Sequence, residues 1–564
     1  MSLVAVLSVG CSTGQHQAHS ESTASVIVLK SPGAGSAPEQ AVQSLGGEVR
    51  VHLGIIHGFS AQVPQNAIPR IAATSGVEAI TPDRSVHSDA ATYSPSTDKS
   101  SMYTLDRLTG AAGYWSRGYT GQGVDVALID TGVAPVEGLS APGKIINGPD
   151  LSFESQADNL RYLDSNGHGT FMAGIIAGKD SSVGSPSNAT SDQFVGVAPD
   201  ARIVSVKVGD AFGTTDTSQV IAGINWVVQH RNDPGMNIRV LNLSFGTDST
   251  QSYTLDPLAY AAEMAWRRGI VVVASAGNDG YGSAALNDPA LDPYVLAVGA
   301  VDLNGTPGHQ DDTVPAWSST GDGVRNPDLV APGVSVVSLR DPGSQIDVEN
   351  PGAVVANRFF RGSGTSQATA MVSGAVALLL QERPGITPDQ VKTILDGSAT
   401  KVPGGNFQAQ GHGTVDLEAA RSYPTQNTVQ TWTSSTGLGT LEGSRGTAHL
   451  SADNVTLQGE EDIFAMPWIP SVWAPAVAAD SSWNGGTWNG SLWTGSAWTT
   501  ASWTGSAWGS VLWTRNSWSG TGWSRNSWSR NSWSRSSWSG KGWTSNRWSS
   551  NTFSRQTWST NRWG

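Results

Sequence analysis

The sequence predicts an α/β domain built on a parallel β-sheet, in residues 105–423 of a chain of 564 residues. Two observations predict this class. The strand-like segments in this range are almost continuously apolar, and amphipathic helical segments alternate with them along the chain. Strands that are buried on both faces and joined by helical crossovers are typical of parallel sheets. The predicted strands are residues 124–130, 201–208, 239–245, 269–276 and 294–301.

A smaller unit of a different type precedes this domain, in residues 25–88. Apolar runs, turn residues and two short helical segments follow one another in the order βαββαβ, and Gly46 and Gly47 end the first helix. This order predicts a small ferredoxin-like α+β fold. Residues 89–104 are polar and contain proline, which predicts an exposed connection that a protease can cut.

Residues 1–24 begin with a short apolar run that ends near Cys11. The run is similar to a secretory or lipoprotein signal, although no Lys or Arg precedes it, so a disordered start stays open as the alternative. No later stretch is long and apolar enough to predict a membrane-spanning helix. We therefore expect a secreted or cell-surface protein and leave open that Cys11 carries a lipid. Because Cys11 is the only cysteine, a disulfide framework and a zinc site of several thiolates are excluded.

Residues 481–564 form a Trp-rich tail, which residues 424–480 connect to the domain. From Trp483 to Trp563 every fifth residue is Trp, except Phe553, and the spacers are mainly small and polar. A period of five gives no single apolar stripe on a helix or on a flat strand. Three interpretations stay open: a β solenoid, packing of the indoles on the rest of the protein, and disorder.

Charge is distributed unevenly between the tail and the rest of the chain. The whole chain has a formal charge of −13, whereas residues 481–564 carry eight Lys or Arg and no Asp or Glu. An acidic body argues against nucleic acid as a partner. A basic tail rich in indoles predicts contact with cell-envelope polymers, through stacking on sugars and pairing with anionic groups.

Four polar residues stand where chemistry is expected. Asp130 closes the first predicted strand, Asn278 follows the fourth, His168 lies in "SNGHGTFMAG", and Ser366 begins an apolar helix. A serine hydroxyl becomes a good nucleophile when an imidazole takes its proton and a carboxylate orients that imidazole. The Ser366 N–H and the Asn278 amide suit a developing oxyanion. Each residue alone is equally typical of a turn or a helix cap, so the hypothesis depends on all four occurring together.

The tetrapeptide GHGT occurs a second time, at residues 411–414. There His412 leads into a charged helical segment instead of a helix of small residues, so we interpret it as part of a closing loop and not as a catalytic group. Asp164 and the carboxylates of residues 192–200 leave calcium open without assigned ligands, because scattered Asp residues are more typical of turns. No other cofactor is expected.

Five motifs in this domain resemble those of the subtilases, the subtilisin-like serine peptidases. They are "DTGV" at Asp130, "HGTFMAG" at His168, "NLSFG", "ASAGN" ending at Asn278 and "GTSQATAMVSG" around Ser366. Their catalytic residues have the order Asp, His, Ser of subtilisin. Ala370 and Gln367 depart from the common proline and methionine of the last motif, which bears on local packing.

The resemblance implies a serine endopeptidase that cleaves proteins or peptides with Asp130, His168 and Ser366 as its triad and Asn278 at the oxyanion. Residues 25–88 resemble the inhibitory propeptide of such enzymes, which implies that the chain is its own inhibitor before it is cut. A non-catalytic envelope-binding protein with a retired peptidase domain is the alternative. The backbone implied to bind the substrate is that of Ser244, Phe245, Gly246, Ala274, Ser275, Ala276 and Gly277.

Overall fold

The computed structural model describes residues 23–83, 93–155, 160–282, 285–452, 455–493 and 562–563. It contains two compact units, residues 1–91 and residues 92–564, and each is described here by itself.

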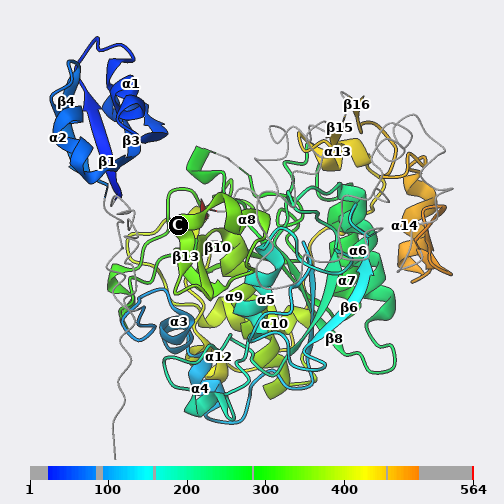
Figure 1. The fold of residues 1–564 in the computed structure, drawn as a ribbon. Helices are drawn as coiled ribbons and strands as arrows, with labels where there is room; N and C mark the ends of the chain where they lie inside the picture. The colour runs from blue at the N-terminus through cyan, green and yellow to red at the C-terminus, as the bar shows by residue number, and fades with distance from the viewer. Residues whose placement is uncertain are drawn as a thin grey trace, which may run out of the picture. The chain divides into compact units, whose positions relative to one another are not determined.

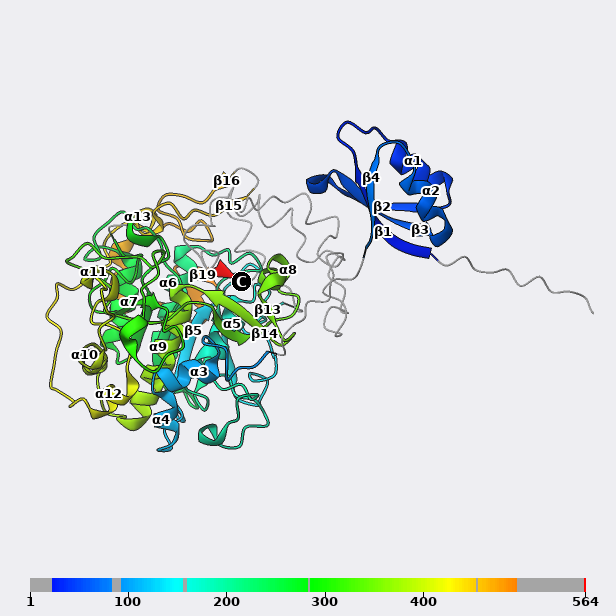
Figure 2. The ribbon, with the colours of Figure 1, turned by 90° about the vertical axis from the view of Figure 1, so that its left-hand side faces the viewer.

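The first unit has the element order predicted from the sequence (Figures 1 and 2). Its four strands form an antiparallel sheet in the order β2-β3-β1-β4. The two helices contact each other, and the core between helices and sheet includes Val28, Val42, Phe59 and Ile71, which are fully buried. The elements are β1 Thr23–Lys30, α1 Ala37–Ser44, β2 Glu48–Leu53, β3 Gly58–Pro64, α2 Ile68–Ala72 and β4 Val77–Pro82.

The second unit is built on a seven-stranded sheet in the order β11-β10-β9-β8-β5-β7-β6, and every pairing in it is parallel. This confirms the predicted fold class. The five predicted strands are present, and the sequence analysis missed two strands at the sheet edges, β6 and β11. The strands are β5 Asp125–Asp130, β6 Ile145–Asp150, β7 Arg202–Lys207, β8 Ile238–Leu243, β9 Val271–Ser275, β10 Leu296–Val301 and β11 Leu329–Pro332.

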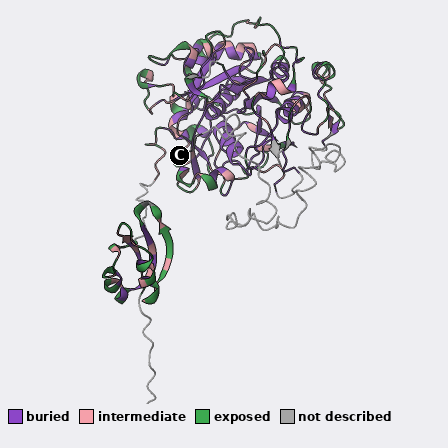
Figure 3. Ribbon diagram, turned by 90° about the horizontal axis from the view of Figure 1, so that it is seen from above, coloured by how far each residue is buried: buried purple, intermediate pink, exposed green. Residues whose placement is uncertain are grey.

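Two pairs of helices pack around this sheet. Helix α5 packs against α9, which also lies along β8, β9 and β10, while α6 packs against α7 (Figure 1). The central strands β5, β9 and β10 are buried along their whole length, which is why they lack polar alternation (Figure 3). The helices are α3 Met102–Leu108, α4 Ala111–Trp115, α5 His168–Ala177, α6 Thr217–His230, α7 Pro257–Arg267, α8 Gln345–Glu349, α9 Thr365–Glu382, α10 Pro388–Ser398, α11 Phe407–Gln410, α12 Leu417–Ser422, α13 Leu441–Arg445 and α14 Pro470–Ala478.

A smaller sheet leads into α9. Its central strand is β14 Phe359–Ser363, and three strands pair antiparallel with it. They are β12 Val336–Leu339, β13 Val354–Val355 and β20 Arg562–Trp563. A further two-stranded ladder is formed by β15 Ser451–Ala452 and β16 Val455–Thr456.

The chain after Tyr423 packs closely on the α6 and α7 side of the second unit. Arg445, which is fully buried, donates through Nε to Asp216 Oδ2 at 2.7 Å, and Asp216 is the N-cap of α6. Helix α14 packs against α7, and the Trp473 indole N–H donates to Asn225 Oδ1 of α6 at 3.1 Å. The later part of residues 424–480 therefore shares the core of the second unit.

The first repeats of the tail form a three-stranded antiparallel meander. Its strands are β17 Trp483–Asn484, β18 Thr487–Trp488 and β19 Ser491–Leu492. The two turns, at 485–486 and 489–490, have positive φ at both residues, as in the tight turns that join short hairpins. Each of the first two strands and the turn after it thus occupy four residues, one fewer than the five-residue spacing of the Trp residues.

The indoles of this meander are buried on α6. Trp483, Trp488 and Trp493 are at most 9% exposed, and the Trp483 indole N–H donates to the Ala222 carbonyl at 2.9 Å. The prediction that the indoles pack on the rest of the protein is therefore confirmed for these three residues. Residues 494–561 lie outside the described residues, so for them the β solenoid and disorder stay open as predictions.

Two other expectations concern the N-terminal half. In the segment predicted to be an exposed connection, Ser100 and Ser101 are buried and Asp98 pairs with Arg361, so its C-terminal end belongs to the body of the second unit. Residues 1–22, with the signal-like run and Cys11, and residues 84–92 lie outside the described residues. Among the helices that the structure does describe, none is long and apolar enough to cross a membrane.

Candidate active site

Asp130 and His168 are in direct contact in the buried centre of the second unit. Asp130 is the last residue of β5 and His168 the first residue of α5, and their side chains are 1% and 0% exposed. The His168 Nδ1–H donates to the carboxylate, with Nδ1 2.8 Å from Oδ1 and 3.0 Å from Oδ2. When Nδ1 carries the proton, Nε2 is the basic nitrogen of the ring, which is the tautomer that a general base requires.

A hydrogen-bonded loop fixes this pair. The Thr131 N–H donates to Asp130 Oδ1 at 2.8 Å, and the Thr131 hydroxyl donates to Asp164 Oδ1, also at 2.8 Å. Asp164 in turn accepts from the N–H groups of Gly167 and Thr170, both at 2.7 Å, at the start of α5. Asp164 therefore links the backbone below the histidine to the backbone beside the aspartate.

The contacts of Asp164 bear on whether it is a turn residue or a calcium ligand. Its carboxylate oxygens are occupied by backbone and hydroxyl donors, which agrees with the turn interpretation of this residue. Within the described part of the chain, no three His, Cys, Asp or Glu residues are grouped as a metal site would require. Calcium binding stays a prediction without ligands.

The glycines beside His168 have separate physical reasons. Gly167 precedes α5 with φ of +105°, a conformation that side chains rarely adopt. At Gly169 an added Cβ would lie 2.1 Å from the Gly132 carbonyl oxygen, so any side chain there would push α5 away from the loop after Asp130. The two glycines let the histidine and the aspartate come close.

Ser366 lies in the first turn of α9, directly after β14, and is 3% exposed. Its hydroxyl donates to the Ser244 carbonyl at 3.5 Å, and the Ser244 hydroxyl donates to the Ser366 carbonyl at 3.3 Å. Helices α5 and α9 also meet in register, since a Cβ at Gly374, eight residues after Ser366, would lie 3.3 Å from the carbonyl of Ile176, eight residues after His168. Because Ile129 lies opposite Leu243 in the parallel pairing of β5 with β8, Asp130 and Ser244 leave the same edge of the sheet, and the starts of α5 and α9, which contact them, lie at that edge.

Asn278 follows β9 and is bonded to the start of α9. Its Oδ1 accepts from the Thr365 N–H at 2.9 Å and from the Thr365 hydroxyl at 3.1 Å. These two bonds hold the amide oxygen toward Thr365, and they thereby fix the orientation of the Nδ2 group, which is the donor of the amide. A fixed amide donor next to the helix that carries Ser366 suits stabilisation of an oxyanion.

The two predicted substrate segments leave the sheet side by side. In the parallel pairing of β8 with β9, Leu243 lies opposite Ala274, so residues 244–246 and 275–277 follow neighbouring positions at the carboxyl ends of the strands. The carboxyl edge is where parallel sheets hold their ligands.

His412 is in a different environment from His168. Its side chain is 45% exposed, and its Nδ1–H donates to the backbone carbonyl of Asp328 at 3.0 Å. It belongs to the loop after α11, as the interpretation of the second GHGT predicts.

Sequence reasoning missed two features around the site. The Thr131–Asp164 link was missed because Asp164 was considered only as a turn or calcium residue. The second feature is β20, in which Arg562 and Trp563 pair with Ser363 and Gly362 of β14, three residues before Ser366. Nothing in the repeated tail sequence distinguishes this segment from the repeats before it.

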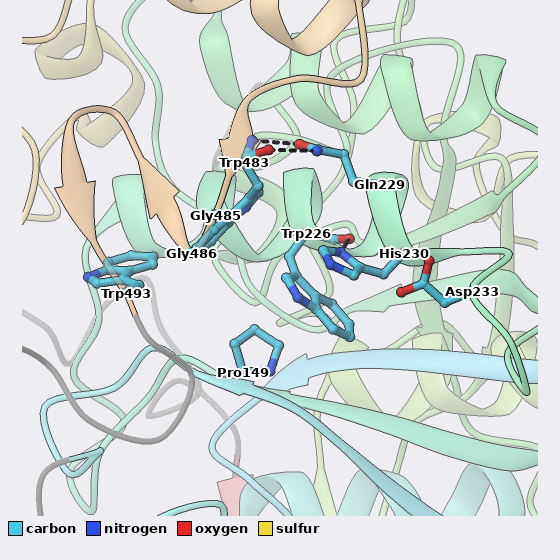
Figure 4. A pocket seen from close by; sticks show the side chains of 9 residues that line it. All are labelled: Pro149, Trp226, Gln229, His230, Asp233, Trp483, Gly485, Gly486 and Trp493. Carbon is cyan, nitrogen blue, oxygen red and sulfur yellow. Dashed lines mark hydrogen bonds between the residues drawn. The ribbon is translucent and has the colours of Figure 1, made fainter.

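A pocket of about 380 Å³ lies outside this site, between α6 and the Trp meander (Figure 4). It contains none of the triad residues. Its walls are Pro149, Trp226, Gln229, His230, Asp233, Trp483, Gly485, Gly486 and Trp493.

Comparison with known proteins agrees with this geometry. Residues 121–413 match the model of the Subtilase family. The serine protease AprX of Bacillus subtilis is 38% identical over 305 residues, which cover 53% of this chain and 66% of AprX. Subtilisin E of the same species is 31% identical over 67% of this chain and 84% of its own length, and subtilisin Savinase of Lederbergia lenta is 34% identical over 54% and 93%.

Among solved structures, fervidolysin of Fervidobacterium pennivorans, described as a keratinolytic enzyme related to subtilisin, has 25% identity and a TM-score of 0.45. That comparison covers 73% of this chain and 63% of fervidolysin. The family match spans more than half of the chain, and the motifs that it covers contain the buried Asp130–His168 pair. The chain belongs to the subtilase family, and by that membership it is a subtilisin-like serine endopeptidase.

Proposed function

We propose that this chain hydrolyses peptide bonds of proteins or peptides with Asp130, His168 and Ser366. The observation that carries the proposal is the buried contact of His168 Nδ1 with Asp130 at 2.8 Å. His168 accepts the Ser366 proton through Nε2 as the hydroxyl attacks the scissile carbonyl, and it then donates that proton to the leaving amine. Asp130 holds the tautomer and stabilises the imidazolium. The reaction needs no cofactor.

The tetrahedral intermediate places a negative charge on the former carbonyl oxygen. In the proposed mechanism the Ser366 N–H at the start of α9 and the Asn278 Nδ2 donate to this oxygen. Support comes from the two Thr365 donors that fix the Asn278 amide before substrate arrives, because a preorganised donor needs no reorientation in the transition state. The backbone of 244–246 and 274–277 would hold the substrate chain.

The proposal is tested with the purified chain and a serine-directed covalent inhibitor. Hydrolysis of a protein substrate that is abolished in step with labelling of Ser366 supports it. Absence of turnover in a folded, processed chain supports the alternative, an envelope-binding protein with a retired peptidase domain.

We further propose that the chain is exported as a self-inhibited precursor. Support comes from the separate βαββαβ unit upstream of the peptidase and from the signal-like start of the sequence. Tethering gives this unit a high local concentration at the cleft, both as a substrate and, once cut, as a product-like inhibitor. The burial of Ser100 and Ser101 favours a cut on their N-terminal side, within the predicted range of 88–104.

Self-processing is tested by replacing Ser366 with Ala. The variant keeps its helix and oxyanion N–H, so it should fold and accumulate as full-length precursor in a host that lacks other secreted proteases, as read by mass spectrometry. Equal removal of residues 25–88 from both proteins would show that another enzyme makes the cut.

The basic tail supports a second proposal, contact with anionic cell-envelope polymers. Because Trp483 to Trp493 are buried on α6, a deletion that tests the tail should begin after Trp493. Such a deletion should not abolish peptide hydrolysis and should weaken retention on isolated envelopes. If retention is unchanged, the tail does not mediate envelope contact. Lipid attachment at Cys11 would be a separate anchor, visible as added mass on the N-terminal peptide.

A further inference from the structure

A buried ion pair lies beside Asp130. Lys207 is the last residue of β7, and in the parallel pairing of β5 with β7 it lies opposite Asp130. Its ammonium group donates to Glu154 Oε2 at 2.6 Å, and the two side chains are 1% and 0% exposed. Burial by itself lowers the pKa of Lys207, but the charges of Glu154 and Asp150 outweigh it and raise this pKa above its ordinary value of 10.5. Lys207 therefore keeps its positive charge, and the pair is anchored to the sheet next to Asp130.

The ion pair is bonded directly to the loop that leads into His168. The Ser165 hydroxyl donates to Glu154 Oε2 at 2.5 Å, and Ser165 is 1% exposed. Lys207 also donates to the backbone carbonyl of Leu163, two residues earlier in the same loop. Both members of the ion pair thus hold the stretch from Leu163 to Ser165.

Glu154 reaches the same loop by a second route, through Ala211 in the loop after β7. The Ala211 N–H donates to Glu154 Oε1 at 3.1 Å, and the Ala211 carbonyl accepts from Asn166 Nδ2 at 2.8 Å. Asn166 Oδ1 in turn accepts from the backbone N–H of His168 at 3.3 Å. The two oxygens of one carboxylate therefore act on the neighbouring residues Ser165 and Asn166, just before the histidine.

We propose that Glu154 is a positioning residue that holds His168 in place against Asp130. The sheet supplies the fixed reference, because Lys207 and Asp130 lie side by side on neighbouring strands. In the proposed mechanism His168 must meet both Asp130 and the Ser366 hydroxyl, and a displacement of about 1 Å can lower a rate about a hundredfold. These bonds do not involve the backbone proposed to hold the substrate, so the effect is expected in kcat and not in KM. The inference rests on the proposed function of the triad.

Replacing Ser165 with Ala tests the direct route, because it removes one hydroxyl and leaves the ion pair intact. The kcat on a peptide substrate is divided by the concentration of active sites, titrated with a serine-directed covalent inhibitor, so that loss of folded protein does not lower it. We expect kcat per active site to fall about tenfold with KM unchanged, a loss that corresponds to one hydrogen bond to a carboxylate.

The matched control is Ser444→Ala. The Ser444 side chain is also fully buried, and its hydroxyl donates at 2.8 Å to the carboxylate of Asp256, the N-cap of α7. This variant loses the same kind of hydrogen bond, but the bond is not part of the loop before His168. Its kcat per active site should therefore equal that of the wild type.

A double replacement separates positioning from stability. Glu154→Leu alone leaves Lys207 buried without the counter-charge of Glu154 and should strongly destabilise the second unit. Adding Lys207→Met turns the ion pair into an apolar pair, which should restore much of the stability in urea unfolding. Both routes to the loop before His168 stay broken, so kcat per active site should remain at least about tenfold below the wild type.

Three results would overturn the proposal. They are an unchanged kcat per active site in Ser165→Ala, equal losses in Ser165→Ala and Ser444→Ala, and a kcat that recovers together with stability in the double variant. The last result would make the ion pair purely structural. If the double variant does not fold, the comparison of Ser165→Ala with Ser444→Ala decides. Absence of turnover in the wild type would instead refute the proposed function, so the two failures are distinguishable.

Discussion

Replacing Arg445 with Met should strongly destabilise the second unit. Arg445 and Asp216 are both 0% exposed, and the guanidinium contacts the carboxylate at 2.7 and 3.3 Å. It also donates to the Gly459 carbonyl at 2.7 Å. Methionine keeps much of the length of the side chain but leaves the Asp216 carboxylate buried without a counter-charge. Loss of one partner of a buried ion pair costs about 3–5 kcal/mol, or about two to four orders of magnitude in the unfolding equilibrium.

The pKa of Asp216 gives the pH dependence of this effect. Burial by itself raises this pKa, but the charge of Arg445 and hydrogen bonds from Arg445 and Ser218 outweigh it and lower the pKa below its ordinary value of 3.8. A carboxyl with a lowered native pKa stabilises the folded state above its unfolded pKa, and this contribution is lost as the pH falls through the native pKa. The difference between wild type and Arg445→Met should therefore be large at pH 7 and shrink in acid.

Urea unfolding at pH 7 measures this difference, with Ser366→Ala in every chain to prevent self-digestion. Arg268→Met is the matched control, because its ion pair with Asp480 also ties the later segment to α7 but is about 30% exposed, and it should cost less than about 1 kcal/mol. Adding Asp216→Asn to Arg445→Met should restore part of the lost stability. Equal, small effects of Arg445→Met and Arg268→Met, without this recovery, would refute the reasoning.

Three further predictions concern the site and its surroundings. Asn278→Ala should lower kcat by about 10²–10³ with little change in KM, the size of effect known for the oxyanion asparagine of subtilisin, and an unchanged kcat would remove Asn278 from the mechanism. Deleting Arg562–Trp563 should raise kcat/KM, because β20 pairs with β14 close to Ser366 and there hinders substrate. Deleting Arg547–Trp548, which also follows an Asn, should leave kcat/KM unchanged, and equal effects of the two deletions would rule out a specific role of β20. Burial raises the pKa of Asp292 to about 8, so its stabilising contribution is complete below pH 4 and is lost as the pH rises toward 8. Asp292→Asn should therefore lose less thermal stability than wild type between pH 5 and pH 8, and parallel losses would contradict that pKa.

The sequence predicted most of what lies close together along the chain. The strands β5, β8 and β9 were predicted because a strand buried on both faces has a recognisable apolar run. Asp130 and His168 were found through short motifs, and the structure places them in contact. Edge strands such as β6 were missed because "IINGPD" is only half apolar.

Features that depend on distant partners could not be read in this way. The buried pair of Arg445 and Asp216 joins residues far apart in the sequence, and no local pattern marks either one. The Trp meander was missed for another reason, because the five-residue period was compared with a helix, a flat strand and a β solenoid, but not with short strands joined by tight turns. The turn sequences Gly485–Gly486 and Asn489–Gly490 are typical of tight hairpins, and they were the available signal.

The most direct test of the account is a comparison of the two histidines in the repeated GHGT. His168→Ala and His412→Ala chains, both shown to be folded and freed of residues 1–91 by an added protease that is then removed, are assayed for kcat/KM on one peptide substrate. The account predicts that His168→Ala loses nearly all turnover, because the general base is gone, and that His412→Ala retains most of it. Comparable losses in the two variants, or substantial turnover in His168→Ala, would contradict the assignment of the triad.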